Sequence, residues 1–579
     1  MTARMAGCER LVGNARLAVF LLGVAVAAAA FGGSYLSPWW LVLPLVGFVV
    51  LLFIHESVTR AWFRAGRSVS FYERALARLE DRWRGTGQPG DRFRDEKHPY
   101  AADLDLFGVG SLFELLCTAK TRTGEDTLAA WLRAPAEAEE VRARQAAVAE
   151  LRPRLDLRED LALLGADVPE GVDFGAVAAW GAEPTALGSV WPRVLALVLG
   201  LFALGTLIGW GLDGWPPLSI FVLAVLMELL FAWRMMGRVG AVLKAVEGRA
   251  RDLALLANVL ARLEREDFVS PRLRELREAL DAGGGLRPSQ AIARLSSLVD
   301  VLNWRRNQLF APFAYLLLWG THVAYAIENW RKRSGAAIAR WLAAVGQFEA
   351  LCALAGYAWE NASDPFPEIL DGPGCYDAEG LGHPLIPRSR CVANDLHLCG
   401  ELRVLVVSGS NMSGKSTFLR TVGVNAVLAL AGAPVRAQRL RLTPLTVGAT
   451  LRIEDSLQAG RSRFQAELLR VRQVVDLTRG ALPLLFLFDE IFHGTNSHDR
   501  RLGAEAVVRG LVKAGALGLV TTHDLSLTHV VEHLGTKAAN VHFEDRLEGG
   551  VMVFDYLMRP GVVKHSNALA LMRAVGLEV

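Results

Sequence analysis

The most apolar stretches of the chain come in two pairs. Residues 17–35 and 36–54 form the first pair, with "SYLSPWW" at their junction, and residues 191–210 and 216–233 form the second. Each stretch has about the 20 apolar residues that a helix needs to cross a bilayer. The pattern therefore predicts two transmembrane helical hairpins. A secretory signal cleaved near "AVAAAAFGGS" is the alternative for the first stretch, but the second apolar stretch follows at once and favours an anchor.

Basic residues flank both predicted hairpins but are absent from the two connecting turns. The flanking arginines are Arg4, Arg10, Arg16, Arg60, Arg64, Arg67, Arg193, Arg234 and Arg238. By the positive-inside rule, both termini and all long segments then lie in the cytoplasm. The sequence thus predicts a multi-pass protein of the inner (cytoplasmic) membrane, in contact with the lipid bilayer.

Two of the apolar stretches contain residues that are unusual in a membrane span. Glu228 lies inside the fourth predicted span, where it pairs within the helix bundle, snorkels toward the membrane surface or serves as a functional intramembrane carboxylate. A further apolar run at residues 309–327 contains Pro312 and His322, so we predict a buried helix of the soluble part there.

Most of the remaining N-terminal chain shows the periodicity of amphipathic helices. Apolar residues recur at three- and four-residue spacing in residues 105–134, 136–163, 243–302 and 337–358. Residues 361–387 are rich in proline and glycine instead, which indicates a boundary to the next domain.

That next domain begins with a phosphate-binding pattern. Residues 409–416, "GSNMSGKS", fit G-x-x-x-x-G-K-[ST], between a predicted buried strand at 402–407 and a helix from Lys415. A chance glycine loop would lack these flanking elements. The residues predicted to bind ATP here are Gly409, Ser410, Asn411, Met412, Ser413, Gly414, Lys415, Ser416 and Thr417. We expect Lys415 to reach the β- and γ-phosphates and Ser416 to bind Mg²⁺.

Two later apolar runs end in polar side chains. "LPLLFLFDE" ends in Asp489 and Glu490, and "LGLVTTHD" delivers His523. Strands buried on both faces are typical of a parallel α/β sheet, which binds ligands at the carboxyl ends of its strands. A carboxylate pair alone is more often a helix cap, but after a phosphate loop we expect Asp489 to bind Mg²⁺ and Glu490 to activate water. His523 would contact the γ-phosphate.

Length, charge and composition leave most functional classes open. A chain of 579 residues predicts several domains, and a net charge of +3 neither requires nor excludes nucleic acid. The six cysteines lack the spacing of a metal or redox site, so we predict reduced thiols and no metal cluster. The apolar fraction of 52% and the mean hydropathy of +0.27 are high, because of the predicted hairpins.

Several motifs together resemble the MutS family of DNA mismatch-repair ATPases. "GSNMSGKST", "DSLQAGRSRFQAEL" (residues 455–468), "DEIFHGTN" and "TTHD" are similar to that family's phosphate loop, signature loop, carboxylate strand and histidine strand. "SLFELLCTAKTRTGEDTLAAWLRAP" resembles the start of its helical core, and "FEALCALAGYA" and "GHPLIP" resemble the segment leading into its ATPase. The likeness covers about residues 107–163 and 337–579.

The resemblance implies a homodimer with composite ATP sites. In that family the signature-loop serine of one subunit reaches the γ-phosphate held by the other, a role that falls to Ser462 here. Tyr556 matches a position that stacks on adenine, whereas Cys391 replaces the second aromatic residue. His493 stands where the family has an arginine.

The chain departs from the family at its N-terminus, where a predicted membrane hairpin replaces the mismatch-reading domain. Phe71-Tyr72-Glu73 matches the family's Phe-x-Glu wedge, but it lies on a charged helix without a surrounding DNA-binding domain. We therefore do not infer mismatch recognition, and DNA binding has no located site.

The predicted architecture joins an α/β ATPase domain with a MutS/ABC-like parallel sheet to an all-α, MutS-like core that carries two transmembrane hairpins. The predicted domains are an N-terminal hairpin with a basic juxtamembrane helix (1–84), the first part of the core (85–190), the second hairpin (191–233), the second part of the core with a lever (234–360), a linker with a leading strand (361–400) and the ATPase domain (401–579).

Three functional classes remain open. The first is a membrane-anchored MutS-like ATPase that acts on DNA or a nucleoprotein partner. The second is an ABC-type transport ATPase, although "SLQAGRSRFQAEL" stands where that class has L-S-G-G-Q. The third is an ATP-switched membrane scaffold, against which the intact Lys415, Asp489 and Glu490 argue.

Overall fold

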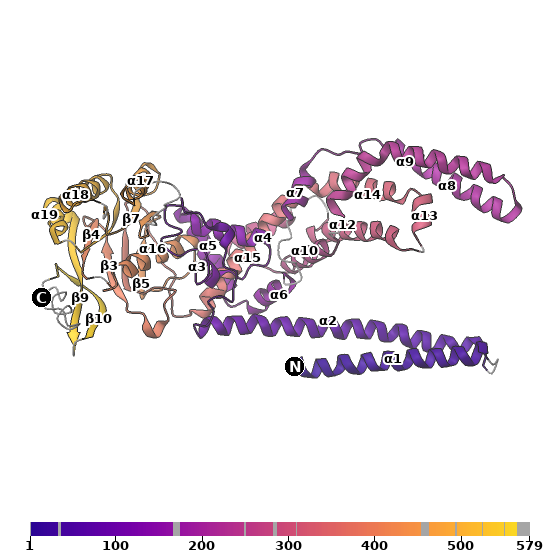
Figure 1. Ribbon diagram of the computed structural model, residues 1–579, viewed down its shortest axis with the longest axis horizontal. Helices are drawn as coiled ribbons and strands as arrows, with labels where there is room; N and C mark the ends of the chain where they lie inside the picture. Colours follow the sequence, from indigo (N-terminus) through magenta and orange to yellow (C-terminus); the bar gives the residue numbers. More distant parts are fainter. Residues whose placement is uncertain are drawn as a thin grey trace.

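The protein is elongated, with a mixed α/β unit at one end and two long helical hairpins at the other (Figure 1). A helical core joins the two ends. The computed structural model describes residues 2–32, 36–165, 174–247, 250–281, 286–308, 310–410, 412–452, 463–492, 495–523, 525–548 and 551–563.

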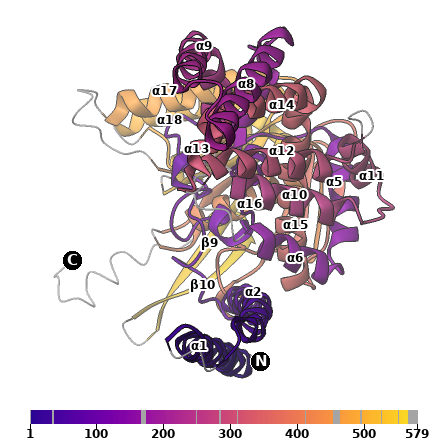
Figure 2. The ribbon, with the colours of Figure 1, turned by 90° about the vertical axis from the view of Figure 1, so that its right-hand side faces the viewer.

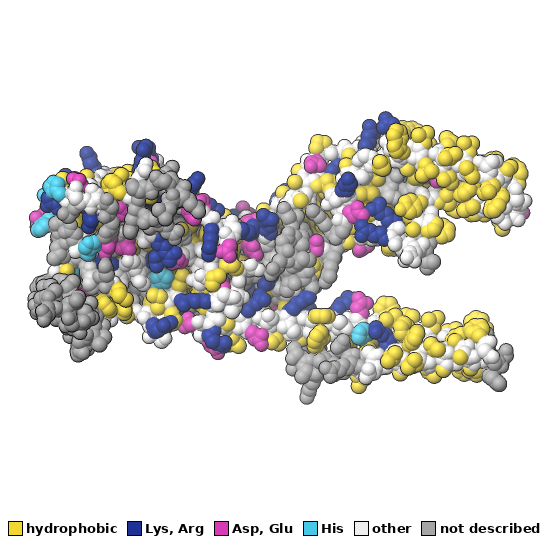
Figure 3. Space-filling model, viewed as in Figure 1, with side chains coloured by type: hydrophobic (Ala, Val, Ile, Leu, Met, Phe, Trp, Pro, Cys, Tyr) yellow, Lys and Arg dark blue, Asp and Glu magenta, His cyan; other side chains and the backbone are white. Residues whose placement is uncertain are grey.

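The two hairpins are formed by helices α1 (Thr2–Gly32) and α2 (Val42–Leu79) and by helices α8 (Trp191–Asp213) and α9 (Leu218–Val246). Both point in the same direction (Figure 1), and the end-on view of Figure 2 shows them on opposite sides of the core. Their outer halves are covered by apolar side chains (Figure 3). Leu43, Phe53, Leu197 and Leu230 are among the exposed ones.

These four helices are long and apolar enough to cross a membrane, by length and composition. In the described part of the chain a fifth segment, Trp319–Glu360, meets the same criterion. Its most apolar window is 78% buried inside the protein, against 6–22% for the hairpin helices. The fifth segment therefore belongs to the protein core, whereas the apolar windows of the four hairpin helices are largely unburied.

Helix α2 continues well past its apolar part. The predicted boundary between a span ending at residue 54 and a juxtamembrane helix is not visible, because α2 runs without a break to Leu79. Its second half lies against the core, where Tyr72 Oη donates a hydrogen bond to Glu159 Oε2 at 2.6 Å. Arg78 forms two hydrogen bonds with Glu360, and both side chains are largely buried. The first hairpin is thus an extension of a helix that is part of the core.

The core is helical, as predicted, but its helices are shorter than the sequence ranges suggested. They are α3 (Leu112–Leu116), α4 (Arg122–Arg133), α5 (Ala138–Leu151), α6 (Leu155–Gly165), α7 (Phe174–Ala182), α10 (Ala250–Leu263), α11 (Pro271–Asp281), α12 (Pro288–Asn303), α13 (Ala311–Leu316), α14 (Trp319–Ser334) and α15 (Ile338–Glu360). The helix predicted at 309–327 is divided, because Pro312 lies at the start of α13 and Leu318 takes a left-handed φ of 48° before α14. Residue 309 lies outside the described part.

Helix α15 is the axis of this core. It is apolar on all sides, which is typical of a fully buried helix, and Trp341, Phe348 and Leu351 are 0–1% exposed. Its buried Glu349 accepts hydrogen bonds from the backbone N–H groups of Lys120 and Thr121 at the start of α4. Burial raises the pKa of Glu349 to about 7. Helix α15 therefore fixes where α4 begins.

The α/β unit contains a six-stranded sheet in the order β10-β9-β4-β8-β7-β6. The strands are β4 (Val404–Ser408), β6 (Thr446–Thr450), β7 (Leu484–Asp489), β8 (Leu517–Thr522), β9 (Ala538–Glu548) and β10 (Val551–Pro560). All neighbours are parallel except β9 and β10. The accompanying helices are α16 (Lys415–Ala431), α17 (Arg463–Asp476), α18 (Ser497–Lys513) and α19 (Val530–Leu534).

Residues 361–400 are more than the predicted linker. They contribute β1 (Glu368–Ile369), β2 (Tyr376–Leu381) and β3 (Asn394–Leu398), which join β5 (Arg439–Leu442) in a second sheet of order β1-β5-β2-β3. The prediction of reduced cysteines is wrong for two of them, since Cys375 and Cys399 form a disulfide. They flank the paired residues Tyr376 and Leu398 of antiparallel strands, which places their Cα atoms 4.5 Å apart.

The ion pair between Arg78 and Glu360 suggests a test of the junction between α2 and α15. Arg78→Ala leaves the largely buried Glu360 carboxylate without its hydrogen-bonding partner. We therefore expect the free energy that holds α2 against α15 to fall by about 2–4 kcal/mol. Hydrogen exchange of the α2 amides should accelerate accordingly, and the double variant Arg78→Glu/Glu360→Arg should restore part of the protection. Arg60→Ala is the matched control, because the side chains of Arg60 and Glu56 are 74% and 59% exposed and their pair is worth less than about 1 kcal/mol. Equal exchange in Arg78→Ala and Arg60→Ala would contradict the assigned role.

Candidate functional site

The candidate site lies at the carboxyl edge of the six-stranded sheet. The predicted strand at 402–407 corresponds to β4, and the turn that follows leads into α16 at Lys415. Gly414, the residue before the helix, has a φ of 101°, and Gly409 at the other end of the turn has a φ of 150°. A Cβ on Gly409 would come within 2.8 Å of Phe543 O, so both conformation and space require glycine there.

The turn leads directly into the N-terminus of α16, and its glycines allow the backbone to bend there. Such an arrangement binds phosphate, because the free N–H groups and the helix dipole both favour negative charge. Lys415, the first residue of α16, is 5% exposed, and its Nζ donates to the carbonyl oxygens of Gly409 and Ser410 at 2.9 and 2.8 Å. The lysine is therefore held over the loop and not in solvent.

Strand β7 brings the two predicted carboxylates to the same place. Asp489 ends the strand, and Glu490 Oε1 lies 3.4 Å from Lys415 Nζ. Strand β8 places His523 beside them, with its Nδ1 3.2 Å from Glu490 Oε2. The structure thus joins Lys415, Glu490 and His523 in one charged cluster, although β4, β7 and β8 are far apart in the sequence.

Thr521 holds the two carboxylates in position. Its hydroxyl donates to Asp489 Oδ1 and accepts a hydrogen bond of 3.0 Å from the Glu490 backbone N–H. Glu490 has a φ of 47°, which is unusual for a residue other than glycine. Strained backbone of this kind persists where the surroundings determine it, commonly at functional sites. The sequence analysis did not identify Thr521, although its place one residue before the end of the third buried strand could have indicated it.

A cavity of about 680 Å³ opens beside the cluster, within the range of small-molecule sites. Its lining includes Lys415, Ser416, Thr417, Asp489, Glu490 and Tyr556. Tyr556, on β10, lies against the phosphate loop, since a Cβ on Gly414 would be 3.0 Å from its ring. Asn394 fixes this tyrosine through hydrogen bonds to Tyr556 O (3.0 Å) and from Met558 N (2.7 Å).

His383 and Cys391 complete the far wall of the cavity. Burial and the nearby Arg420 and Arg436 guanidinium groups lower the pKa of His383 to about 4, so it is neutral at physiological pH. The backbone N–H of His383 donates to Cys391 Sγ at 3.2 Å. His383 is a second residue that the sequence analysis did not assign to the site, although it belongs to the "GHPLIP" segment noted there.

Three positions of interest lie outside the described residues: Asn411 in the phosphate loop, Ser462 in the signature loop and His493 after the carboxylates. Residues close to Ser462 and His493 in the sequence are described. The ring of Phe464 lies edge-on to that of Phe492, with centroids 6.4 Å apart, and Glu467 is 1% exposed. The start of α17 therefore packs against the segment that follows Glu490.

The site suits a nucleoside triphosphate with its magnesium ion. Glycine turns, a helix N-terminus and a buried lysine match the phosphates, and Mg²⁺ prefers oxygen ligands such as the Ser416 hydroxyl and the Asp489 carboxylate. Among the described residues, no group of three or more His, Cys, Asp or Glu side chains forms a metal-binding cluster.

In a comparison with known families, residues 405–578 fit the family model of MutS domain V. That domain is the ATPase domain of the MutS family, so the match supports ATP binding and ATPase activity for this part of the chain. It also agrees with the resemblance found in the C-terminal motifs.

Proposed function

We propose that this protein is a membrane-anchored, MutS-like ATPase whose composite sites form in a homodimer, and that it acts on DNA or a nucleoprotein partner at the cytoplasmic face of the membrane. The observation that carries the proposal is the meeting of Lys415, Glu490 and His523 beside the phosphate loop. The second observation in its favour is that the same chain carries apolar hairpins that the rest of the protein does not cover.

Each residue of the site then has a separate task. The loop N–H groups and Lys415 bind the phosphates of ATP, and Ser416 and Asp489 hold Mg²⁺, which neutralises phosphate charge when it is bound. Glu490 orients the attacking water and accepts its proton. His523 lies on the other side of Glu490, where it can contact the γ-phosphate. Tyr556 packs against the base.

A dimer would complete the site through Ser462 of a second copy. Exposed apolar side chains support this arrangement, because Met412 in the phosphate loop is 83% exposed and Leu468 and Leu469 on α17 are also exposed. Exposed apolar side chains are common at interfaces between proteins. A hydroxyl supplied across that interface makes hydrolysis depend on the relative position of the two subunits.

The catalytic assignment predicts the behaviour of Glu490→Gln. The amide cannot accept the proton of water, so we expect ATP turnover to fall by at least about 100-fold. Nucleotide affinity should change little, because the phosphates are bound by the loop and Lys415. Steady-state phosphate release and equilibrium binding of a fluorescent ATP analogue measure the two effects. Glu544→Gln, on β9, is a control expected to hydrolyse ATP at the normal rate, and unchanged turnover in Glu490→Gln would remove this residue as the base.

The anchor is tested by fractionation of the full chain. Two hairpins that cross the bilayer cannot be removed by alkaline carbonate, which strips proteins held by surface charge alone. We therefore expect the protein in the carbonate pellet and in the detergent extract of that pellet. Recovery in the carbonate supernatant would contradict the proposed membrane location.

The DNA role is tested by binding at several salt concentrations. If the protein neutralises several phosphates, its affinity for duplex or branched DNA should fall steeply between about 50 and 200 mM salt, because bound counterions are released. We expect a mobility shift of DNA by the detergent-solubilised protein at low salt, with ATP or a non-hydrolysable analogue present. Mismatched and matched duplexes should bind equally, since no mismatch-reading domain is predicted. No shift at low salt would exclude DNA and leave a protein partner.

A further inference from the structure

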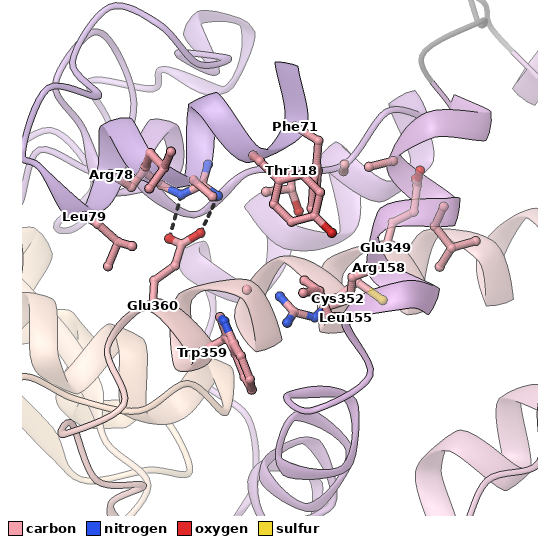
Figure 4. A pocket seen from close by; sticks show the side chains of 17 residues that line it. Phe71, Arg78, Leu79, Thr118, Leu155, Arg158, Glu349, Cys352, Trp359 and Glu360 are labelled. Carbon is pink, nitrogen blue, oxygen red and sulfur yellow. Dashed lines mark hydrogen bonds and ion pairs between the residues drawn. The ribbon is translucent and has the colours of Figure 1, made fainter. Parts of the chain in front are cut away.

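A second cavity lies between α2, α6 and α15, where the first hairpin joins the core (Figure 4). Its volume is about 170 Å³. A cavity of about 150 Å³ lined by apolar side chains holds one benzene molecule. The cavity therefore has room for a ring or a short chain.

Most of its wall is apolar. Phe71, Leu76, Leu155, Leu161 and Trp359 contribute to the lining. Phe71 belongs to the Phe-Tyr-Glu sequence that resembles a mismatch wedge, and here it lies on the buried side of α2 next to Tyr72. Phe71 and Tyr72 of this sequence therefore line a pocket in the core.

Among the polar side chains that line the cavity, Arg158 on α6 has no salt-bridge partner in the described part of the chain. Arg158 is 7% exposed, and it lies near the ring of Trp359, 5.9 Å from the ring centroid. Its Nη2 donates to Arg152 O at 3.0 Å, whereas its buried Nε has no hydrogen-bond partner among the described residues. A buried cation that lacks an anionic partner is strongly unfavourable.

The carboxylates that also line the cavity have other partners. Glu360 pairs with Arg78, as Figure 4 shows, and Glu349 accepts its hydrogen bonds from Thr121 and the backbone of Lys120. In the described part of the chain, neither forms a salt bridge with Arg158. Burial lowers the pKa of Arg158, and the nearby Glu360 carboxylate, which is hydrogen-bonded to Arg78, acts in the opposite direction.

We infer that this cavity is a binding site for a small organic carboxylate, with the carboxylate group on Arg158 and an apolar part about the size of a benzene ring between Phe71 and Trp359. A carboxylate suits a guanidinium group because charge-assisted hydrogen bonds to it are short and strong. The bound molecule would touch both α2, which continues into the first hairpin, and α15, which leads to the α/β unit. The site is independent of the proposed ATPase and DNA functions.

Benzoate and hexanoate are the probes, added to the full-length protein in lipid nanodiscs, with empty nanodiscs as the blank. We expect saturable binding of at least one of them by equilibrium dialysis, with one site per chain. Benzamide, the neutral isostere of benzoate, should bind at least about tenfold more weakly because it lacks the charge. Absence of saturable binding by both carboxylates, or equal binding of benzoate and benzamide, would overturn the inference.

Two variants locate the site. Arg158→Gln removes the charge, and Ala75→Phe fills the cavity from α2 without changing Arg158. Both should lose carboxylate binding. Arg265→Gln changes an exposed arginine of the core and should bind as the unmodified protein does. If Arg158→Gln folds poorly, the test rests on Ala75→Phe. Normal carboxylate binding by Ala75→Phe would overturn the inference.

Discussion

Parallel strand pairing is the constraint on which the functional site depends. Ser408, Asp489 and Thr522 end three strands that are widely separated in the sequence, and their order β4-β8-β7 brings these ends to one edge. Each strand is almost entirely apolar and buried, so polar side chains appear only where a strand leaves the sheet. The charged and polar side chains of the candidate site are therefore concentrated at this edge, because the interior of the sheet cannot accommodate charge.

The core and the hairpins differ in whether their apolar side chains are buried. In the core, apolar side chains are covered by neighbouring helices, and α15 is buried along nearly its whole length. On the outer halves of the hairpins, equally apolar side chains are left uncovered (Figure 3). Exposed apolar surface on this scale is typical of a surface that contacts another protein or a membrane, and these helices are long and apolar enough to cross a bilayer. Because α2 is continuous from the first hairpin to Arg78, a force on that hairpin would reach α15 through a single helix.

The sequence predicted what depends on local pattern and missed what depends on contacts. The phosphate loop, the strands ending in Asp489 and before His523, and the apolar helices were visible in periodicity and spacing. Thr521 and Asn394 were not, because each acts through a hydrogen bond to a residue distant in sequence. The second sheet was missed because β1 and β2 lie in the proline- and glycine-rich stretch at 361–387, and β3 and β5 are only five and four residues long. The disulfide between Cys375 and Cys399 depends on the register of β2 and β3, which cysteine spacing does not reveal.

One buried residue shows how the nucleotide site and the helical core are connected. Asp103 is 1% exposed, and its carboxylate accepts hydrogen bonds from the backbone N–H groups of Leu451 and Arg452 and from Arg470 on α17. Its carbonyl oxygen accepts another from Arg420, on the helix that begins at Lys415. The two ends of the signature-loop region and the phosphate-loop helix are therefore attached to one point of the core. Any rearrangement of these elements during an ATP cycle has to either move that point or break its hydrogen bonds. Because the carboxylate is buried, breaking them is costly, so displacement of the core is the more favourable response.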